Sequence, residues 1–340
     1  MKKKISIIEE MIENYNSIII TTHENPDGDA LGSCLGLYSI LCKFKNKVNV
    51  VIPNKFPKYF DWMPNIEEII IFQDNIDSSS KLISQADLIF MLDFNNVERL
   101  GNLNNYISNS NAKKIMIDHH QDPNYCDSDI IISDTTRSST CELLFEVINN
   151  SNLKKNIDSQ TAECLYTGII TDTATFKHPS TTYNTHDVAS KLLQYGLDKS
   201  LIHSYLLENN SEDQLRLLGY CINEKMNIYS EYKSSIISVT QEELDKFKFK
   251  PGNTEGIVNY PLSIRDINLS VFIVEKDKKT IKMSFRSKGN IRVNDLSKKY
   301  FNGGGHNNAA GGLSNLTIEE TIQKLKEIFK KYKNELITNI

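Results

Sequence analysis

Five short runs of apolar residues, separated by amphipathic stretches, dominate the first half of the chain. They predict strands at residues 17–22, 48–52, 69–72, 87–94 and 113–118. Residues 18–20 and 88–92 are apolar at every position, which is typical of strands buried on both faces. Strands that alternate with helical spacing predict a doubly wound, mostly parallel α/β sheet.

The second half of the chain predicts another unit. Helical spacing dominates residues 138–208, and strand patterns return at 235–239, 269–275 and 280–286 before a terminal helix at 317–336. A length of 340 residues allows two or three domains. We therefore predict a catalytic domain at 1–208, a linker helix at 209–231 that acts as a spacer, and a smaller mixed α/β domain at 232–340.

Charge balance and cysteine content narrow the class of protein. The chain carries 39 basic and 43 acidic side chains, so it lacks the positive field that coats long duplex nucleic acid. No apolar run approaches the roughly 18 residues of a membrane helix. The six cysteines form no C-x-x-C pair, which is typical of reduced thiols in a cytoplasmic protein.

A histidine and two aspartates follow the first predicted strand. His23, Asp27 and Asp29 lie in the segment HENPDGD, where Pro and Gly shape a turn. Open α/β sheets bind their ligands at the carboxyl ends of the strands. This spacing favours a metal site, although a polar turn whose aspartates cap the next helix explains the segment equally well by itself.

Two further predicted strands end in acidic or imidazole groups. Residues 88–92 lead to Asp93, and residues 114–117 lead to Asp118, His119 and His120. Because successive strand residues point to opposite faces, we expect the two histidines to have different roles. Asp172 adds a carboxylate within an apolar helical stretch, where burial without a cation is costly.

Together these segments predict one set of metal ligands: His23, Asp27, Asp29, Asp93, His119 and Asp172. Oxygen and imidazole ligands without sulfur suit Mn²⁺, with Mg²⁺ or Co²⁺ as alternatives. Four carboxylates carry about four negative charges, which two divalent ions neutralise. A single divalent ion would leave a net negative charge that repels phosphate. Two divalent metal ions close together promote phosphoester hydrolysis.

These motifs resemble the DHH phosphoesterase superfamily, which is named after the triplet found here at 118–120. The resemblance extends over most of the chain and rests on His23-x-x-x-Asp27-x-Asp29, Asp93, Asp118-His119-His120 and Gly168-x-x-x-Asp172. It implies one Mn²⁺ held by His23, Asp27 and Asp93, and a second held by Asp29, Asp93, His119 and Asp172.

The resemblance also implies roles for three residues outside this ligand set. His120 would be catalytic, as a phosphate contact or as the general acid. Asp118 would assist it by accepting a hydrogen bond that fixes an imidazole tautomer. Arg137 would lie near the site and help to hold phosphate.

A glycine cluster lies near the end of the chain. The run Gly303-Gly304-Gly305-His306 opens it, and it lacks the Gly-Lys-Ser/Thr of a phosphate-binding P-loop. Small residues let backbone N–H groups approach a phosphate closely, and His306 can stack on a base or bind a phosphate oxygen. A flexible loop is the alternative interpretation of such a glycine triplet.

A basic segment precedes the glycine cluster. Residues 276–299 contain nine basic and two acidic side chains, and most of them are expected to form a solvated surface. Arg286 is the exception, because a guanidinium just before the glycine cluster can bind a terminal phosphate through two hydrogen bonds.

Residues 256–312 are similar to the DHH-associated C-terminal domain through residues 256–261, the Ser284-Phe285-Arg286-Ser287 segment and the glycine cluster. The combination looks most like the nanoRNase and pAp phosphatase group. That resemblance implies very short RNA or dinucleotides and 3′-phosphoadenosine 5′-phosphate (pAp) as substrates. It further implies substrate contacts by Arg286, Ser287 and the glycine cluster, and a homodimer.

Several other functions stay open from the sequence. A RecJ-like single-strand exonuclease usually carries a further OB-like domain, and a family II pyrophosphatase lacks this glycine-rich ending. Linear dinucleotides are an alternative substrate, while cyclic-dinucleotide phosphodiesterases of the superfamily are membrane-anchored. A non-catalytic nucleotide sensor is the alternative from another class, but such proteins commonly lose at least one ligand.

Overall fold

The computed structural model describes residues 1–45, 47–121, 128–208, 210–250, 252–277 and 280–338. The chain divides into two compact units, Met1–Asn209 and Asn210–Ile340. Cys126 and, in the basic segment, Lys278 and Lys279 lie outside the described residues. The five cysteines within the described ranges are free thiols. None of the helices in those ranges combines the length and the apolar character that a bilayer span requires.

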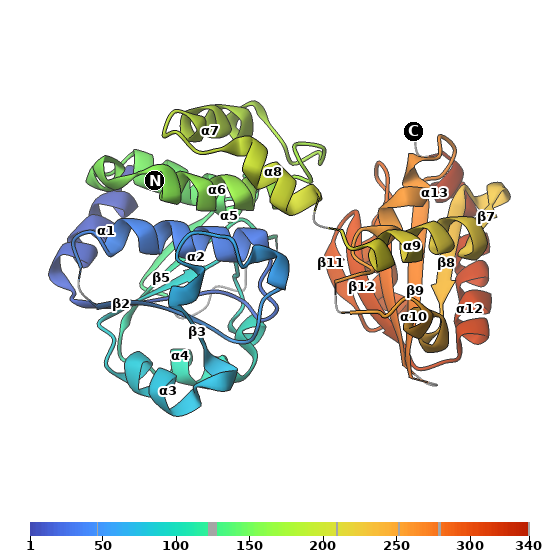
Figure 1. Ribbon diagram of the computed structural model, residues 1–340, viewed down its shortest axis with the longest axis horizontal. Coiled ribbons are helices and arrows are strands. Elements are labelled where there is room, and N and C mark those ends of the chain that lie inside the picture. The colour runs from blue at the N-terminus through green and yellow to red at the C-terminus, as the bar shows by residue number, and fades with distance from the viewer. Residues whose placement is uncertain (46, 122–127, 209, 251, 278–279, 339–340) are drawn as a thin grey trace. The chain divides into compact units, whose positions relative to one another are not determined.

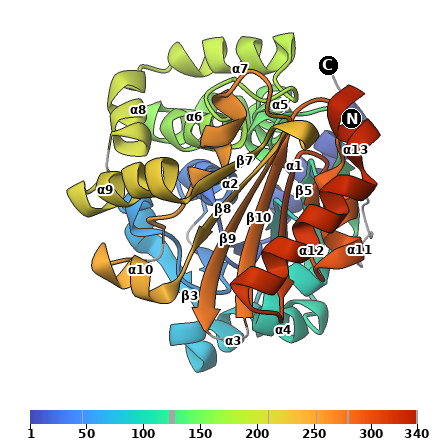
Figure 2. The ribbon, with the colours of Figure 1, turned by 90° about the vertical axis from the view of Figure 1, so that its right-hand side faces the viewer.

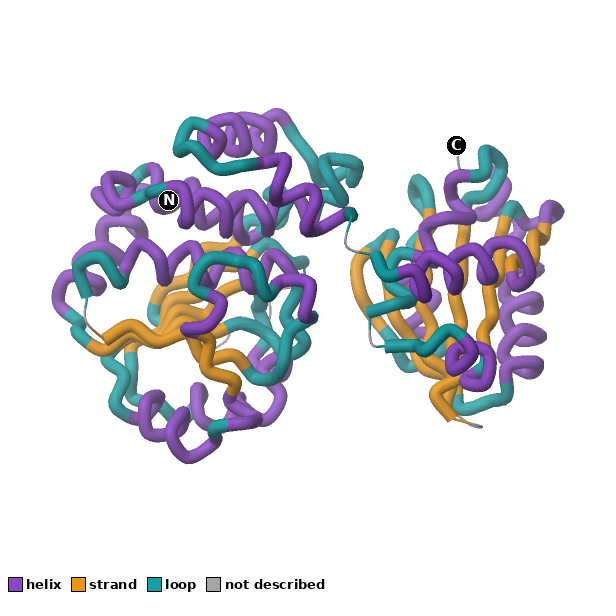
Figure 3. Tube along the Cα trace, viewed as in Figure 1, coloured by secondary structure: helices purple, strands orange, loops and turns teal. Residues whose placement is uncertain are grey.

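A six-stranded, fully parallel sheet forms the centre of the first unit, in the order β3-β2-β1-β4-β5-β6 (Figure 3). Its strands are β1 (Ser17–Thr21), β2 (Lys47–Ile52), β3 (Ile69–Ile71), β4 (Leu88–Leu92), β5 (Lys113–Asp118) and β6 (Ile130–Ser133). The predicted doubly wound α/β fold is therefore confirmed. The short strand β6 at the edge of the sheet was not predicted from the sequence.

Helices cover both faces of this sheet, as the continuous apolar runs predicted (Figure 1). Ile18 and Ile20 pack into one core, whereas Ile19 packs into the core on the opposite face. The first face carries α1 (Lys2–Asn14), α2 (Gly28–Leu41), α5 (Thr140–Asn149), α6 (Ser159–Asp172), α7 (Tyr183–Leu193) and α8 (Lys199–Leu207). The second face carries α3 (Ile76–Ser84), α4 (Asn104–Ser108) and the short 3₁₀ segment η4 (Val97–Leu103).

The strand order indicates where the first unit would bind a ligand. The chain runs outward from β1 through β2 to β3, then returns to the other side of β1 with β4. In a sheet of this order, the loops that follow the two strands at the reversal separate and leave a crevice at their carboxyl ends. The segment 23–29 follows β1 and Asp93 follows β4, so both predicted ligand groups emerge at this point.

The second unit is built on a mixed sheet in the order β11-β12-β10-β9-β8-β7, in which only β8 and β9 run parallel. Its strands are β7 (Met226–Tyr229), β8 (Ser234–Val239), β9 (Leu269–Asp277), β10 (Thr280–Ser287), β11 (Gly304–His306) and β12 (Ala309–Ser314). Its helices are α9 (Glu212–Tyr220), α10 (Gln241–Lys246), α11 (Val293–Tyr300), α12 (Ile318–Lys331) and α13 (Lys333–Thr338). Figure 2 shows α11 and α12 on one face of this sheet and α9 and α10 on the other.

Two segments of the second unit differ from the simple pattern read in the sequence. The range 209–231, predicted as a linker helix, contains α9 and also β7, which pairs with β8. The glycine cluster, for which no strand was predicted, forms the antiparallel pair β11 and β12. Glycine has a low strand propensity, so the pairing depends on neighbouring strands rather than on the local sequence.

Candidate metal centre

The turn after β1 serves both as a helix cap and as a ligand-bearing segment. Asp27 is the N-cap of α2, and its Oδ1 accepts hydrogen bonds from the N–H groups of Asp29 and Ala30, both at 3.1 Å. Oδ2 of Asp27 has no hydrogen-bond partner among the described residues, so it can bind another group. His23 is buried beside this turn, and its Nδ1 lies 2.9 Å from the carbonyl oxygen of Glu24. This contact aims Nε2 of His23 toward the crevice.

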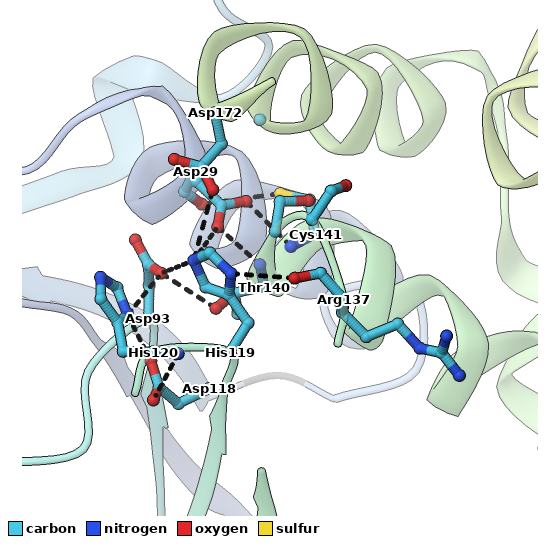
Figure 4. Close-up of polar contacts among 12 residues, drawn as sticks. Asp29, Asp93, Asp118, His119, His120, Arg137, Thr140, Cys141 and Asp172 are labelled. Atoms are coloured by element: carbon cyan, nitrogen blue, oxygen red, sulfur yellow. Dashed lines mark hydrogen bonds and ion pairs between the residues drawn. The ribbon is translucent and has the colours of Figure 1, made fainter. Parts of the chain in front are cut away.

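The start of α5 holds Asp29 in place. The N–H of Thr140 donates to Oδ2 of Asp29 at 2.6 Å, and the N–H of Cys141 donates to Oδ1 at 2.9 Å (Figure 4). The Thr140 hydroxyl donates to Oδ1 of Asp93 at 2.9 Å. Helix N-terminal N–H groups stabilise negative charge. The sequence analysis missed Thr140 and Cys141 in this role, although a cap at Ser139 could have marked the helix start.

Asp93 lies at the centre of the cluster. It is 1% exposed and adopts a left-handed backbone conformation with φ of 66°, which turns the chain out of β4. Burial, and then the neighbouring carboxylates of Asp29 and Asp27, raise the pKa of Asp93 well above its ordinary value. A carboxylate in this environment is stabilised in its ionised form only by positive charge, such as that of a cation.

His119 and His120 both face Asp93, with ring centroids 4.7 Å apart, but their other ring contacts differ (Figure 4). Their different roles stay a prediction. Nδ1 of His119 lies 3.3 Å from the carbonyl oxygen of Arg137, which leaves Nε2 3.3 Å from Oδ2 of Asp172. Nδ1 of His120 lies 2.7 Å from Oδ1 of the fully buried Asp118. Asp118 thus lies within hydrogen-bond distance of His120, and its role in fixing the imidazole tautomer stays a prediction.

Asp172 closes the cluster from the end of α6. Burial, and then Asp29, raise the pKa of Asp172 to about 8. Burial alone lowers the pKa of His119, but the carboxylates of Asp172 and Asp29 outweigh it and raise that pKa. Burial, followed by the charge of Arg99, lowers the pKa of His23, so its imidazole is kept neutral and able to act as a ligand.

The side chains form overlapping groups whose donor atoms lie within 4.8 Å of one another. These groups are His23, Asp27 and Asp93; Asp29, His119 and Asp172; and Asp93, His119 and His120. Nε2 of His23 is buried without a hydrogen-bond partner among the described residues and lies 3.4 Å from Oδ2 of Asp93. An unpartnered imidazole nitrogen facing a buried carboxylate fits a cation between them. All six predicted ligands thus lie in one cluster whose donors fit two divalent ions.

Two arginines near the cluster differ in their contacts. Nε of Arg137 lies 3.1 Å from Glu146 and 3.6 Å from Asp134, and its guanidinium points away from the cluster (Figure 4). The phosphate contact expected from Arg137 would require this ion pair to break. Arg99, which the sequence analysis missed, has Nη1 3.2 Å from Nε2 of His120.

The predicted substrate residues of the second unit gather where three strands meet. Arg286 on β10 is paired with Ala309 on β12, which in turn is paired with His306 on β11. Directly paired residues project from the same face of a sheet, so Arg286 and His306 lie on either side of Ala309. Two strand spacings put their Cα atoms roughly 10 Å apart. Nη1 of Arg286 donates a hydrogen bond to the carbonyl oxygen of Phe285 at 3.0 Å, and burial lowers the pKa of the Arg286 guanidinium.

The glycines and Ser287 have structural contacts of their own. A side chain at Gly303 would overlap the Gly311 carbonyl, and one at Gly305 would lie 2.5 Å from the Ala309 carbonyl, so both glycines permit the tight β11–β12 pairing. Gly304 is different, since an added Cβ would only come within 3.9 Å of a lysine side chain. The Ser287 hydroxyl donates to the carbonyl of Ile291 at 2.6 Å.

Sequence comparisons agree with this geometry. Residues 17–169 match the DHH family, N-terminal domain, and residues 233–335 match the DHHA1 domain. The bifunctional oligoribonuclease and PAP phosphatase NrnA of Bacillus subtilis is 31% identical over 88% of this chain and 90% of that protein. The chain belongs to the DHH family. Its DHH triplet is Asp118-His119-His120, which supplies a predicted ligand and the contact that orients its neighbour.

Two further relatives of this DHH protein have different names. The cyclic-di-AMP phosphodiesterase GdpP of Bacillus subtilis is 24% identical over 96% of this chain and 49% of that longer protein. An exopolyphosphatase-related protein from Bacteroides fragilis has a crystal structure with a TM-score of 0.96 and 39% identity, which covers 99% of this chain and 98% of that one. The fold of that crystal structure is therefore shared over 99% of this chain.

Proposed function

We propose that this DHH protein hydrolyses very short RNA, above all dinucleotides, to mononucleotides, and converts pAp to AMP. The observation that carries the proposal is the cluster of three overlapping metal-donor groups, two of which contain Asp93, with Asp118 in contact with His120 beside it. The name of the Bacillus subtilis relative supports the two substrate classes. The position of the cluster at the strand-order reversal supports ligand binding there.

We propose Mn²⁺ as the native metal, because the donors are carboxylates and imidazoles without sulfur. His23, Asp27 and Asp93 would hold one ion, and Asp29, His119 and Asp172 the other, with Asp93 shared. Divalent ions held there would supply Lewis-acid polarisation of the phosphate and a nucleophilic water at neutral pH.

The chain itself supplies orientation and proton control. Asp118 accepts a hydrogen bond from Nδ1 of His120, which leaves Nε2 on the side away from Asp118. A phosphate contact or proton transfer from Nε2 to the leaving oxygen would require the imidazolium, in which Nε2 also carries a proton. The α5 N–H groups that bind Asp29 keep its carboxylate fixed as charge develops in the reaction.

The second unit would select short substrates. Arg286 and His306 lie on one face with only Ala309 between them, which suits a nucleotide phosphate and its base. The open side of Gly304 allows close approach of a ligand to the backbone. The whole chain has a formal charge of −4, so it lacks the net positive charge that favours binding of a long duplex. A homodimer and a cytoplasmic location stay predictions, which sedimentation and cell fractionation would test.

The test is a time course of product release by the Mn²⁺-loaded protein. The substrates are an RNA dinucleotide, pAp, cyclic di-AMP, a long single-stranded RNA and pyrophosphate, each with an EDTA control. We expect fast release of mononucleotides from the dinucleotide and turnover of pAp, both abolished by EDTA. Asp93→Asn should remove both activities, whereas the surface variant Asp187→Asn, matched in chemistry, should keep them.

Other outcomes would reject the proposal in different ways. Preferred cleavage of cyclic di-AMP would favour the activity named for GdpP. Cleavage of only the long RNA or only pyrophosphate would refute the short-RNA assignment while leaving the metal centre intact. Absence of any turnover at full metal content would favour a nucleotide sensor.

A further inference from the structure

Arg99 occupies a position that the fold fixes through both its main chain and its side chain. Its carbonyl oxygen accepts a hydrogen bond of 2.6 Å from the N–H of Glu24, whose own carbonyl contacts the imidazole of His23. Its guanidinium Nη1 lies 3.2 Å from Nε2 of His120. Arg99 therefore connects the segment after β1 to the histidine triplet after β5, with its charge at the edge of the metal centre.

Within the described part of the chain, the guanidinium of Arg99 has no carboxylate partner. Among the described residues, no aspartate or glutamate oxygen lies within 4.0 Å of its guanidinium nitrogens. The carboxylate of Glu24 lies elsewhere, close enough to Gly101 that an added Cβ there would be 3.0 Å from it. Arg137 shows the contrast, because its guanidinium is paired with two carboxylates.

The guanidinium also has donors to spare. It carries five N–H groups in a planar fork. Only the contact with His120 is made by its side chain within the described part of the chain. A partly buried cation with unused donors, beside a cluster that fits two metal ions, is suited to bind an anion that reaches the same centre.

We propose that Arg99 binds the substrate phosphate that is cleaved at the metal centre, while the same guanidinium holds Nε2 of His120 beside that phosphate. Because a guanidinium can only donate, it holds this nitrogen as an acceptor, consistent with the Nδ1 proton directed at Asp118. Asp118 thus contacts His120, His120 contacts Arg99, and Arg99 binds the phosphate. Arg99 takes the phosphate-binding role that the sequence analysis expected of Arg137. The inference rests on the proposed phosphoesterase function.

The test compares Arg99→Gln and Arg99→Lys with the parent, all loaded with Mn²⁺, on pAp and on an RNA dinucleotide. Arg99→Gln should lower kcat/KM by about 10- to 100-fold, chiefly through KM, because a charge-assisted contact to substrate is lost. Arg99→Lys keeps the charge without the fork and should recover part of the loss. The exposed Arg216→Gln, whose partner is a surface glutamate, should leave both constants unchanged.

Two further readouts separate phosphate binding from a structural role. Inorganic phosphate should inhibit the parent competitively, with an inhibition constant about tenfold weaker in Arg99→Gln. Free guanidinium at low concentration should raise the activity of Arg99→Ala, which repair of the fold alone would not do. Unchanged KM and unchanged phosphate inhibition in both Gln and Lys variants, at full metal content, would overturn the inference. An inactive parent would instead refute the proposed function, so the two failures are distinguishable.

Discussion

Replacing Asp118 by asparagine tests how the triplet is organised. The carboxylate of Asp118 accepts two hydrogen bonds from His120, from Nδ1 at 2.7 Å and from the backbone N–H at 3.1 Å. Asparagine has one oxygen and can accept only one of them. If its oxygen keeps the backbone bond, its NH₂ group faces Nδ1 and moves the ring proton to Nε2, where the guanidinium of Arg99 also donates.

The magnitude follows from the bond that is lost in either arrangement. A hydrogen bond to a charged group contributes about 1.5–3 kcal/mol, which corresponds to about 10- to 150-fold in kcat if it acts in the transition state. Metal content should stay unchanged, because Asp118 is in none of the donor groups. Removing its negative charge also reduces repulsion with Asp93 and Asp172, so we expect no loss of folding stability in the metal-free protein.

The assay is steady-state hydrolysis of an RNA dinucleotide and of pAp by the parent and Asp118→Asn. Metal content is measured by elemental analysis and the melting temperature by calorimetry. A kcat within twofold of the parent at full metal content would refute the orienting role of Asp118. A loss of bound metal would show instead that Asp118 is itself a ligand.

Three other perturbations have defined outcomes. Without metal, folded Asp172 has a pKa of about 8, whereas in the unfolded chain its pKa is close to the ordinary 3.8, so its contribution to stability should fall as the pH rises from about 4 to 8. The gain in melting temperature on adding Mn²⁺ should therefore grow with pH, and a gain independent of pH would contradict this. Gly168→Ala would place a methyl group against the Cys141 sulfur and should cost about 1–3 kcal/mol in denaturant unfolding. Gly219→Ala, where an added Cβ meets nothing within 4 Å, is its control and should not destabilise. Ala174→Gly should raise the unfolding free energy by roughly 0.5–1 kcal/mol, because Ala174 has a φ of 47° that is strained for L-residues, and no gain in the urea midpoint would show that the strain is absent.

The first unit and its candidate metal ligands could be predicted from the sequence because the signals are local. Apolar strands and the polar residues that follow them are neighbours in the chain, and parallel strands bring their carboxyl ends to one edge of a sheet. Asp93 and His119 could therefore be placed together from residue patterns alone. The strand order then decided that β1 and β4 are adjacent, which no local pattern contains.

The second unit shows where local patterns fail. The run at 303–306 has the composition of a loop, yet it forms β11 because Gly303 and Gly305 allow β12 to approach closely. The residues that flank Ala309 in space, Arg286 and His306, become neighbours only through strand pairing.

The sequence by itself determined the α/β class, the six metal-ligand candidates and the family resemblance, since each depends on residue type and short spacing. The tertiary structure decided which groups support them. Thr140 reaches Asp29 across 111 residues of sequence, and Arg99 reaches His120 across 21. The tertiary structure also decided that the guanidinium of Arg137 contacts Glu146 and that the guanidinium of Arg99 contacts His120 at the metal-donor cluster. Side-chain direction depends on packing between distant segments, so only the folded chain specifies it.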